Sequence, residues 1–194
     1  MRFEQTCFRA HYPQWAFKPL SGDGAAIRGA RFNPRGMPAL YLGLDIMTAV
    51  KEANQGFAHK IDPCILCSYE VACDDIADLR TVESRAEHSV PMEDLACGWF
   101  ALLAAGKEPP TWEIVRRLHG EGKAGILVPS FAPGATADDH NLVLWLWDEN
   151  PPHQVRVFDP SGRLPKDQLS WRKGDKRTND EIKMSKECQM SKSK

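Results

Sequence analysis

The sequence lacks an apolar run long enough to cross a membrane and lacks an excess of charge of either sign. Lysine and arginine number 25 and aspartate and glutamate 26, which gives a formal net charge of -1. This balance excludes nucleic acid and anionic membranes as partners bound mainly by charge. Residues 1–7 also lack the basic start and apolar stretch of a signal peptide. We therefore expect a cytoplasmic protein with no direct nucleic-acid or membrane partner.

A metal-ligand pattern is also missing. Among six cysteines, Cys64 and Cys67 have zinc-like spacing, but no second pair follows, and Cys67 lies in an apolar segment where a free cysteine acts as a small hydrophobe. Asp138, Asp139 and His140 are adjacent, and adjacent side chains rarely converge on one ion. We expect no metal.

The pattern of apolar residues predicts one α+β domain over residues 1–170, with mixed small sheets and flanking helices, and a polar, lysine-rich tail over 171–194. A long stretch over 12–30, rich in Gly, Pro and Ser, is expected to be irregular and functional. The expected strands are 7–11, 39–42, 64–71, 125–129, 142–147 and 155–158. The expected helices are 46–55, with Asp45 as N-cap, 91–105 and 110–118.

Three residues of different chemistry lie close together near the start of the chain. Arg31 follows glycine and alanine in a turn, where its guanidinium can make forked hydrogen bonds to phosphate. Tyr41 lies in a short apolar strand and can stack on a flat ring. Glu52 lies at the edge of the apolar face of the 46–55 helix. Taken singly, each also fits an ordinary role: a surface arginine, a core tyrosine or a surface glutamate.

Ser130 is a further candidate for a binding site. Ser130 ends the apolar strand 125–129, where a hydroxyl can meet a ligand, but no Gly-x-Ser-x-Gly motif activates it as a nucleophile. Its alternative role is that of a turn serine.

The order of these signals resembles the RES family, which is named after an arginine, a glutamate and a serine. Arg31, Glu52 and Ser130 stand where those three should be, and the resemblance covers roughly residues 7–160. The residues around them agree: Arg9, the Gly-Ala-Arg-Phe-Asn-Pro-x-Gly turn over 29–36, the Ala-Leu-Tyr-Leu strand and the Asn-Leu-Val-Leu strand. Phe32 departs from the tryptophan that many members carry.

The resemblance implies a toxin of a type II toxin–antitoxin pair with a fold similar to ADP-ribosyltransferase toxins. It implies NAD as the substrate, and as partner an antitoxin whose helix-turn-helix region binds DNA and whose C-terminal region covers the active site. Glu52 would then stabilise the ribose cation that forms when the nicotinamide bond breaks. Arg31 and Arg9 would bind phosphate, and Tyr41 would stack on nicotinamide or pack beside its ribose. Ser130 would bond the ribose or phosphate, or orient Glu52, while Asn141 would line the pocket.

The sequence leaves the acceptor of ADP-ribose open. Water, phosphate and a protein side chain all follow the same cation-forming step, so a glycohydrolase, a phosphorylase and a protein ADP-ribosyltransferase remain alternatives. A non-catalytic protein-binding module is the alternative from another class. A metal hydrolase that uses Asp138, Asp139, His140 and the Cys64/Cys67 pair is the weakest alternative.

Overall fold

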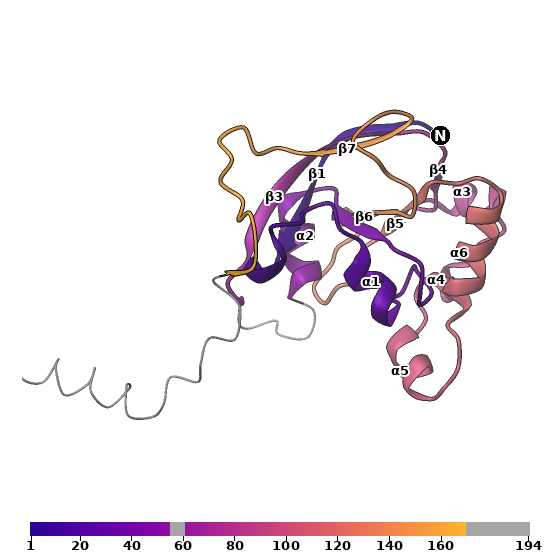
Figure 1. Ribbon diagram of the computed structural model, residues 1–194. Helices are drawn as coiled ribbons and strands as arrows, with labels where there is room; N and C mark the ends of the chain where they lie inside the picture. Colours follow the sequence, from indigo (N-terminus) through magenta and orange to yellow (C-terminus); the bar gives the residue numbers. More distant parts are fainter. Residues whose placement is uncertain (55–60, 170–194) are drawn as a thin grey trace, which may run out of the picture.

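The computed structural model describes residues 1–54 and 61–169 and shows a mixed α/β domain (Figure 1). The strands are β1 (Phe3–His11), β2 (Leu40–Gly43), β3 (Ile65–Cys73), β4 (Ile76–Asp78), β5 (Gly125–Pro129), β6 (His140–Leu144) and β7 (His153–Val157). The helices are η1 (Pro13–Trp15), α1 (Asp23–Arg28), α2 (Ile46–Ala53), α3 (Val82–Glu87), α4 (Met92–Leu95), α5 (Trp99–Ala104) and α6 (Pro110–Gly120). The predicted α+β class is confirmed.

The strands form one sheet in the order β4-β5-β6-β2-β1-β3-β7, and this corrects the expectation of several small sheets. β4 and β5 are parallel, while the other ladders are antiparallel. β1 pairs with β3 along its whole length but with β2 only through Phe8 and Gly43. The sheet is therefore nearly interrupted between β1 and β2, and this interruption leaves room for a cavity.

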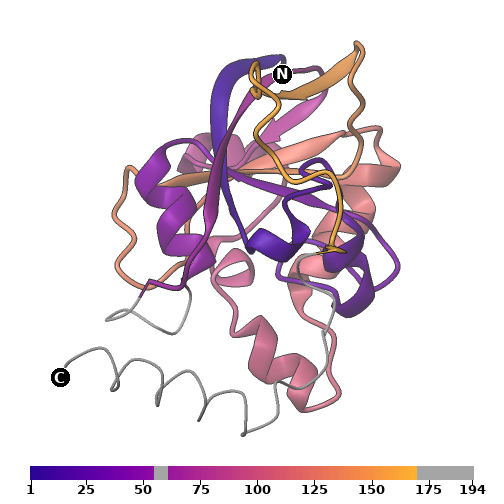
Figure 2. The ribbon, with the colours of Figure 1, turned by 60° about the vertical axis from the view of Figure 1, so that its left-hand side comes forward.

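The strands β5 and β6 are buried on both faces. Successive residues point to opposite faces of a strand, so Leu142 packs in one apolar cluster and Val143 in the other. The second cluster includes Val115 and Leu118 of α6, and α6 lies beside the β4–β5 end of the sheet in both views (Figures 1 and 2). Burial on both faces explains why these strands read as continuous apolar runs.

Several expected boundaries were wrong. The stretch 12–30 is not wholly irregular, because it contains η1 and α1. The helix expected over 91–105 is two short helices, α4 and α5, separated at 96–98, and α5 projects from one end of the molecule (Figures 1 and 2). The last two strands begin two residues earlier than expected, and β4 and α3 were not predicted. The predicted tail and the predicted end of α2 at Gln55 lie outside the described residues.

Candidate active site

A cavity of about 280 Å³ lies at the interruption between β1 and β2. Its walls combine aromatic rings with two arginines, one glutamate and one asparagine. The lining residues are Phe8, Arg9, Ala10, Ala25, Ala30, Arg31, Phe32, Tyr41, Leu42, Gly43, Ala49, Glu52, Ala53, Trp99, Phe131 and Asn141. The cavity therefore collects residues from β1, β2, α1, α2, α5 and β6, which are far apart in the sequence.

Glu52 reaches the cavity because α2 presents one face to the sheet. Asp45 caps this helix by accepting a 2.9 Å hydrogen bond from the Thr48 amide, as predicted. Ala49, one turn before Glu52, is buried, so Glu52 lies on the inner side of α2. Its Oε1 accepts a 2.6 Å hydrogen bond from the Ser130 hydroxyl and another from the Asn141 side-chain amide. Both donors are buried, which fixes the carboxylate in one orientation.

Arg31 lies in a turn that glycine makes possible. Gly29 has φ +71°, and a Cβ there would lie 2.8 Å from the Trp112 ring, so a larger residue would be excluded on two grounds. The Nη1 of Arg31 donates to the carbonyls of Leu95, at 3.0 Å, and Cys97, at 2.6 Å. Its guanidinium carbon lies 4.6 Å from the centre of the Phe131 ring.

The environment of Arg31 favours an anionic ligand. Within the described part of the chain, both of its hydrogen bonds use Nη1, while a guanidinium carries five N–H donors. Burial lowers the pKa of Arg31, and nearby Cys97 and Glu52 oppose that shift. A partly desolvated guanidinium that lines a cavity can bind phosphate strongly.

Tyr41 contributes its ring to the cavity, while its hydroxyl is used elsewhere. The hydroxyl donates to Asn33 Oδ1 at 2.8 Å and accepts from the Phe32 amide at 3.0 Å. Burial raises the pKa of Tyr41, so the hydroxyl stays protonated. Asn33 is fully buried, and its amide donates to the carbonyls of Ala25 and Met37, both at 3.0 Å. Tyr41 and Asn33 together hold the turn that carries Arg31.

Arg9 also lines the cavity, although its guanidinium is directed at the chain before α1. Its Nη1 donates to the carbonyls of Ser21, at 3.2 Å, and Pro19, at 3.5 Å. Burial lowers the pKa of Arg9. Arg9 therefore connects β1 to the segment that leads into α1.

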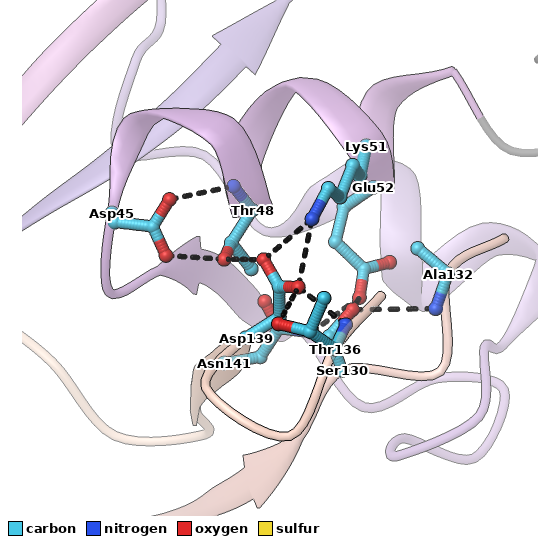
Figure 3. Close-up of polar contacts among 9 residues, drawn as sticks. All are labelled: Asp45, Thr48, Lys51, Glu52, Ser130, Ala132, Thr136, Asp139 and Asn141. Carbon is cyan, nitrogen blue, oxygen red and sulfur yellow. Dashed lines mark hydrogen bonds and ion pairs between the residues drawn. The ribbon is translucent and has the colours of Figure 1, made fainter. Parts of the chain in front are cut away.

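Behind Glu52, an ion pair connects α2 to the segment that precedes β6 (Figure 3). Lys51 Nζ lies 2.7 Å from Asp139 Oδ2 and 3.0 Å from Oδ1. The Thr48 hydroxyl donates to Asp139 Oδ1 at 2.7 Å, and the Thr136 amide and hydroxyl donate to Oδ2. Asp139 is therefore surrounded by donors, and the bond from Lys51 contributes most to holding its pKa far below the usual range.

Asp139 is also one of the candidate metal ligands in the sequence, and the structure pairs it with Lys51. Residues 1–54 and 61–169 contain no group of three or more histidine, cysteine or acidic side chains able to hold an ion. Cys64 is exposed while Cys67 is buried in β3. Nor does any helix in the described ranges have the length and apolar character needed to span a bilayer.

Comparison with known proteins gives a match to the RES domain family model over residues 6–167. The chain belongs to the RES domain family. A solved structure, the MbcT–MbcA toxin–antitoxin complex of M. tuberculosis, shares the fold of this RES domain with a TM-score of 0.54 and 21% sequence identity. The alignment covers 82% of this chain and 84% of the other. A comparison with curated proteins found no significant match.

The RES domain brings five of the six sequence-predicted site residues to the cavity wall: Arg9, Arg31, Tyr41, Glu52 and Asn141. Ser130 is not among the lining residues, and its hydroxyl lies behind the cavity against Glu52. Of the two roles expected for Ser130, this position supports orientation of Glu52.

Sequence reasoning missed the aromatic wall of the RES domain and the ion pair behind Glu52. Phe8, Phe131 and Trp99 line the cavity, but each lies in a segment that reads as an ordinary apolar stretch. The sequence offers Asp139 only as a candidate metal ligand. The spacing of Thr48, Lys51 and Glu52 could have indicated that Lys51 and Glu52 both lie on the side of the helix that carries Thr48, since residues three and four apart share a face.

Proposed function

We propose that this RES domain is an enzyme that cleaves the bond between nicotinamide and ribose in NAD and acts as the toxin of a toxin–antitoxin pair. The observation that carries the proposal is the Glu52 carboxylate, oriented by Ser130 and Asn141 in a cavity that Arg31 also lines. A fixed negative charge beside an apolar wall is suited to stabilising a cation that forms during a reaction.

The chemistry follows from the leaving group. When the N-glycosidic bond breaks, its electron pair goes to the nicotinamide nitrogen, which becomes neutral, and positive charge develops on the ribose ring. The Glu52 carboxylate stabilises that charge. An acceptor then forms a bond to the same ribose carbon and loses a proton. Water gives ADP-ribose, phosphate gives its phosphate ester, and a protein side chain gives an ADP-ribosylated protein.

The cavity suits the nicotinamide half of the substrate. Its volume, about 280 Å³, lies at the lower end of the range for small-molecule sites. The rings of Tyr41, Trp99 and Phe131 offer flat apolar surfaces for the nicotinamide ring. We assign the pyrophosphate to Arg31, with Arg9 as a second phosphate contact and Asn141 at the ribose side. No metal is needed for these roles.

We further propose a cytoplasmic antitoxin as partner, with a helix-turn-helix region that binds DNA and a C-terminal segment that covers the cavity. The structural neighbour is itself a toxin–antitoxin complex. Exposed apolar side chains also support a covering partner, because Phe100 on α5 is 73% exposed and Ile27 on α1 is 75% exposed. Both helices contribute residues to the cavity wall.

The proposal is tested by incubating the purified chain with NAD in three conditions: buffer alone, buffer with phosphate, and buffer with cell lysate. Nicotinamide release and the fate of ADP-ribose are followed by chromatography. Release in buffer or phosphate supports an NAD-degrading toxin, and release only with lysate, with label on one protein, supports a transferase. No release from folded, antitoxin-free protein in any condition would contradict the proposal and favour a non-catalytic binding module.

A further inference from the structure

Ser130 and Asn141, which both hold Glu52, lie at the two ends of one short segment, 130–141. Ser130 begins this segment and Asn141 ends it, and both donate to Glu52 Oε1 (Figure 3). The segment therefore controls where the carboxylate lies. Interactions that hold the segment against α2 therefore also hold the Glu52 carboxylate in place.

Asp139 makes hydrogen bonds to other residues of this segment. Its backbone carbonyl accepts from the Ser130 amide at 2.8 Å, and its side chain accepts from the amide and hydroxyl of Thr136. The same carboxylate also binds Lys51 and Thr48 of α2. Asp139 thus joins the start of the segment through its backbone carbonyl, and it joins the middle of the segment to the helix that carries Glu52 through its side chain.

The burial of these groups makes their pairing important. The Asp139 side chain is 6% exposed and the Lys51 side chain 26% exposed. Removing one partner of a buried ion pair leaves the other charge uncompensated, which is costly in a medium of low dielectric. The segment would then move so that the remaining charge reaches water, and Ser130 and Asn141 would move with it.

We propose that Asp139 is a positioning residue for the reaction, which acts through Lys51 and the 130–141 segment to set the orientation of Glu52. The inference rests on the proposed function, because it concerns the rate of the reaction that Glu52 serves. Asp139 does not line the cavity, and its effect therefore falls on the catalytic step and not on NAD binding.

The test compares kcat and KM for nicotinamide release in the wild type, Asp139→Asn, Lys51→Gln and Lys51→Arg. We expect kcat to fall about tenfold or more in Asp139→Asn and Lys51→Gln, because small displacements of a catalytic group cost large factors in rate. We expect KM to stay within about threefold of the wild type, since the binding groups are unchanged. Lys51→Arg keeps the charge and should retain most of the activity.

The matched control is Asp78→Asn. Asp78 forms an ion pair of the same length, 2.7 Å, with Arg80 at the β4 edge of the sheet, and neither residue lines the cavity. This variant should keep the wild-type kcat. An unchanged kcat in Asp139→Asn, or an equal loss in Asp78→Asn, would overturn the inference.

A second readout separates failure of the inference from failure of the proposed function. Amide hydrogen exchange of the 130–141 segment does not require NAD turnover. In Asp139→Asn we expect faster exchange at Thr136, whose amide bonds to the Asp139 side chain, with the exchange of β5 unchanged. A wild type that does not consume NAD would refute the proposed function alone, whereas unchanged exchange in Asp139→Asn would refute the positioning role.

Discussion

At the scale of single residues, the site depends on side chains that have two tasks at once. Arg31 lines the cavity and also bonds the carbonyls of Leu95 and Cys97, which lie where α4 ends and before α5 begins. Tyr41 lines the cavity and also holds Asn33 through its hydroxyl. Because these side chains are fixed before any ligand binds, they are arranged in advance for the role that we propose for them.

Arg31→Lys should weaken NAD binding. Lysine keeps the positive charge but cannot bond two carbonyls and a pyrophosphate in the fixed planar geometry of a guanidinium. We expect the Kd for NAD, measured by calorimetry, to rise about tenfold or more. This change corresponds to the free energy that one hydrogen bond to a charged group contributes to binding. Arg35→Lys, a change in an exposed arginine four residues along the same turn, is the control. An unchanged Kd in Arg31→Lys would exclude the phosphate-binding role.

At the scale of elements, strands were easier to predict than helices. Alternating apolar residues predict β3, and a continuous apolar run predicts β5. Both predictions succeed because the burial of a strand produces a pattern among residues that are adjacent in the sequence. The helix expected over 91–105 is interrupted at 96–98, where the distant Arg31 binds the carbonyls of Leu95 and Cys97. A contact over more than sixty positions is not visible in a local pattern.

The site residues were predictable for a different reason. Their order along the chain, from Arg31 through Tyr41 and Glu52 to Ser130, was recognisable without knowing how they meet. The bond from Ser130 to Glu52 was one of two alternatives, and the role of Asp139 in holding the segment was not foreseen. Both depend on contacts between α2 and the distant 130–141 segment, which no local pattern encodes.

Gly43→Ala should destabilise the domain, because α2 begins very close to the end of β2. A Cβ at Gly43 would lie 2.7 Å from the Ala49 backbone nitrogen and 3.1 Å from the Asp45 carbonyl oxygen. Backbone atoms cannot relieve such a clash by a change of rotamer. We expect the free energy of unfolding in urea to fall by about 1–3 kcal/mol. Gly24→Ala, in α1, has nothing within 4 Å and should be neutral or slightly stabilising. Equal stability of the two variants would contradict this view of the junction.

At the scale of the whole molecule, the near-interruption of the sheet is the main architectural feature. The β1–β3–β7 part of the sheet pairs with the β2–β6–β5–β4 part through a single ladder pair, Phe8 and Gly43, and the cavity lies at that boundary. Residues from both halves hold the chain before α1: Arg9 and Tyr69 donate to the Pro19 carbonyl, and Trp147 donates to that of Leu20. The stability of the site and of the fold are therefore coupled.

Stability should fall in mild acid because of His11. Burial, and secondarily the nearby charge of Arg9, lower the pKa of His11 from 6.5 to about 4. Below pH 6.5 the unfolded chain binds a proton that the folded protein does not, so stability is lost as pH falls toward 4. Between pH 7.5 and 4.5 we expect this histidine to cost roughly 2–3 kcal/mol of unfolding free energy.

Urea unfolding of wild type and His11→Gln at these two pH values checks this expectation. Glutamine does not titrate but can still hydrogen bond to the Tyr69 hydroxyl, which lies 2.5 Å from His11 Nε2. The variant should lose less stability in acid than the wild type. An equal loss in both proteins would show that other groups cause the acid sensitivity.

The most direct test of the account concerns Glu52. Glutamine at this position can still accept hydrogen bonds from Ser130 and Asn141 but carries no negative charge. We predict that nicotinamide release by Glu52→Gln falls about a hundredfold or more while the Kd for NAD stays near the wild-type value. Glu113→Gln, a change in an exposed glutamate of α6, should behave as the wild type. Turnover of Glu52→Gln equal to that of the wild type would contradict the central claim that this carboxylate stabilises the ribose cation.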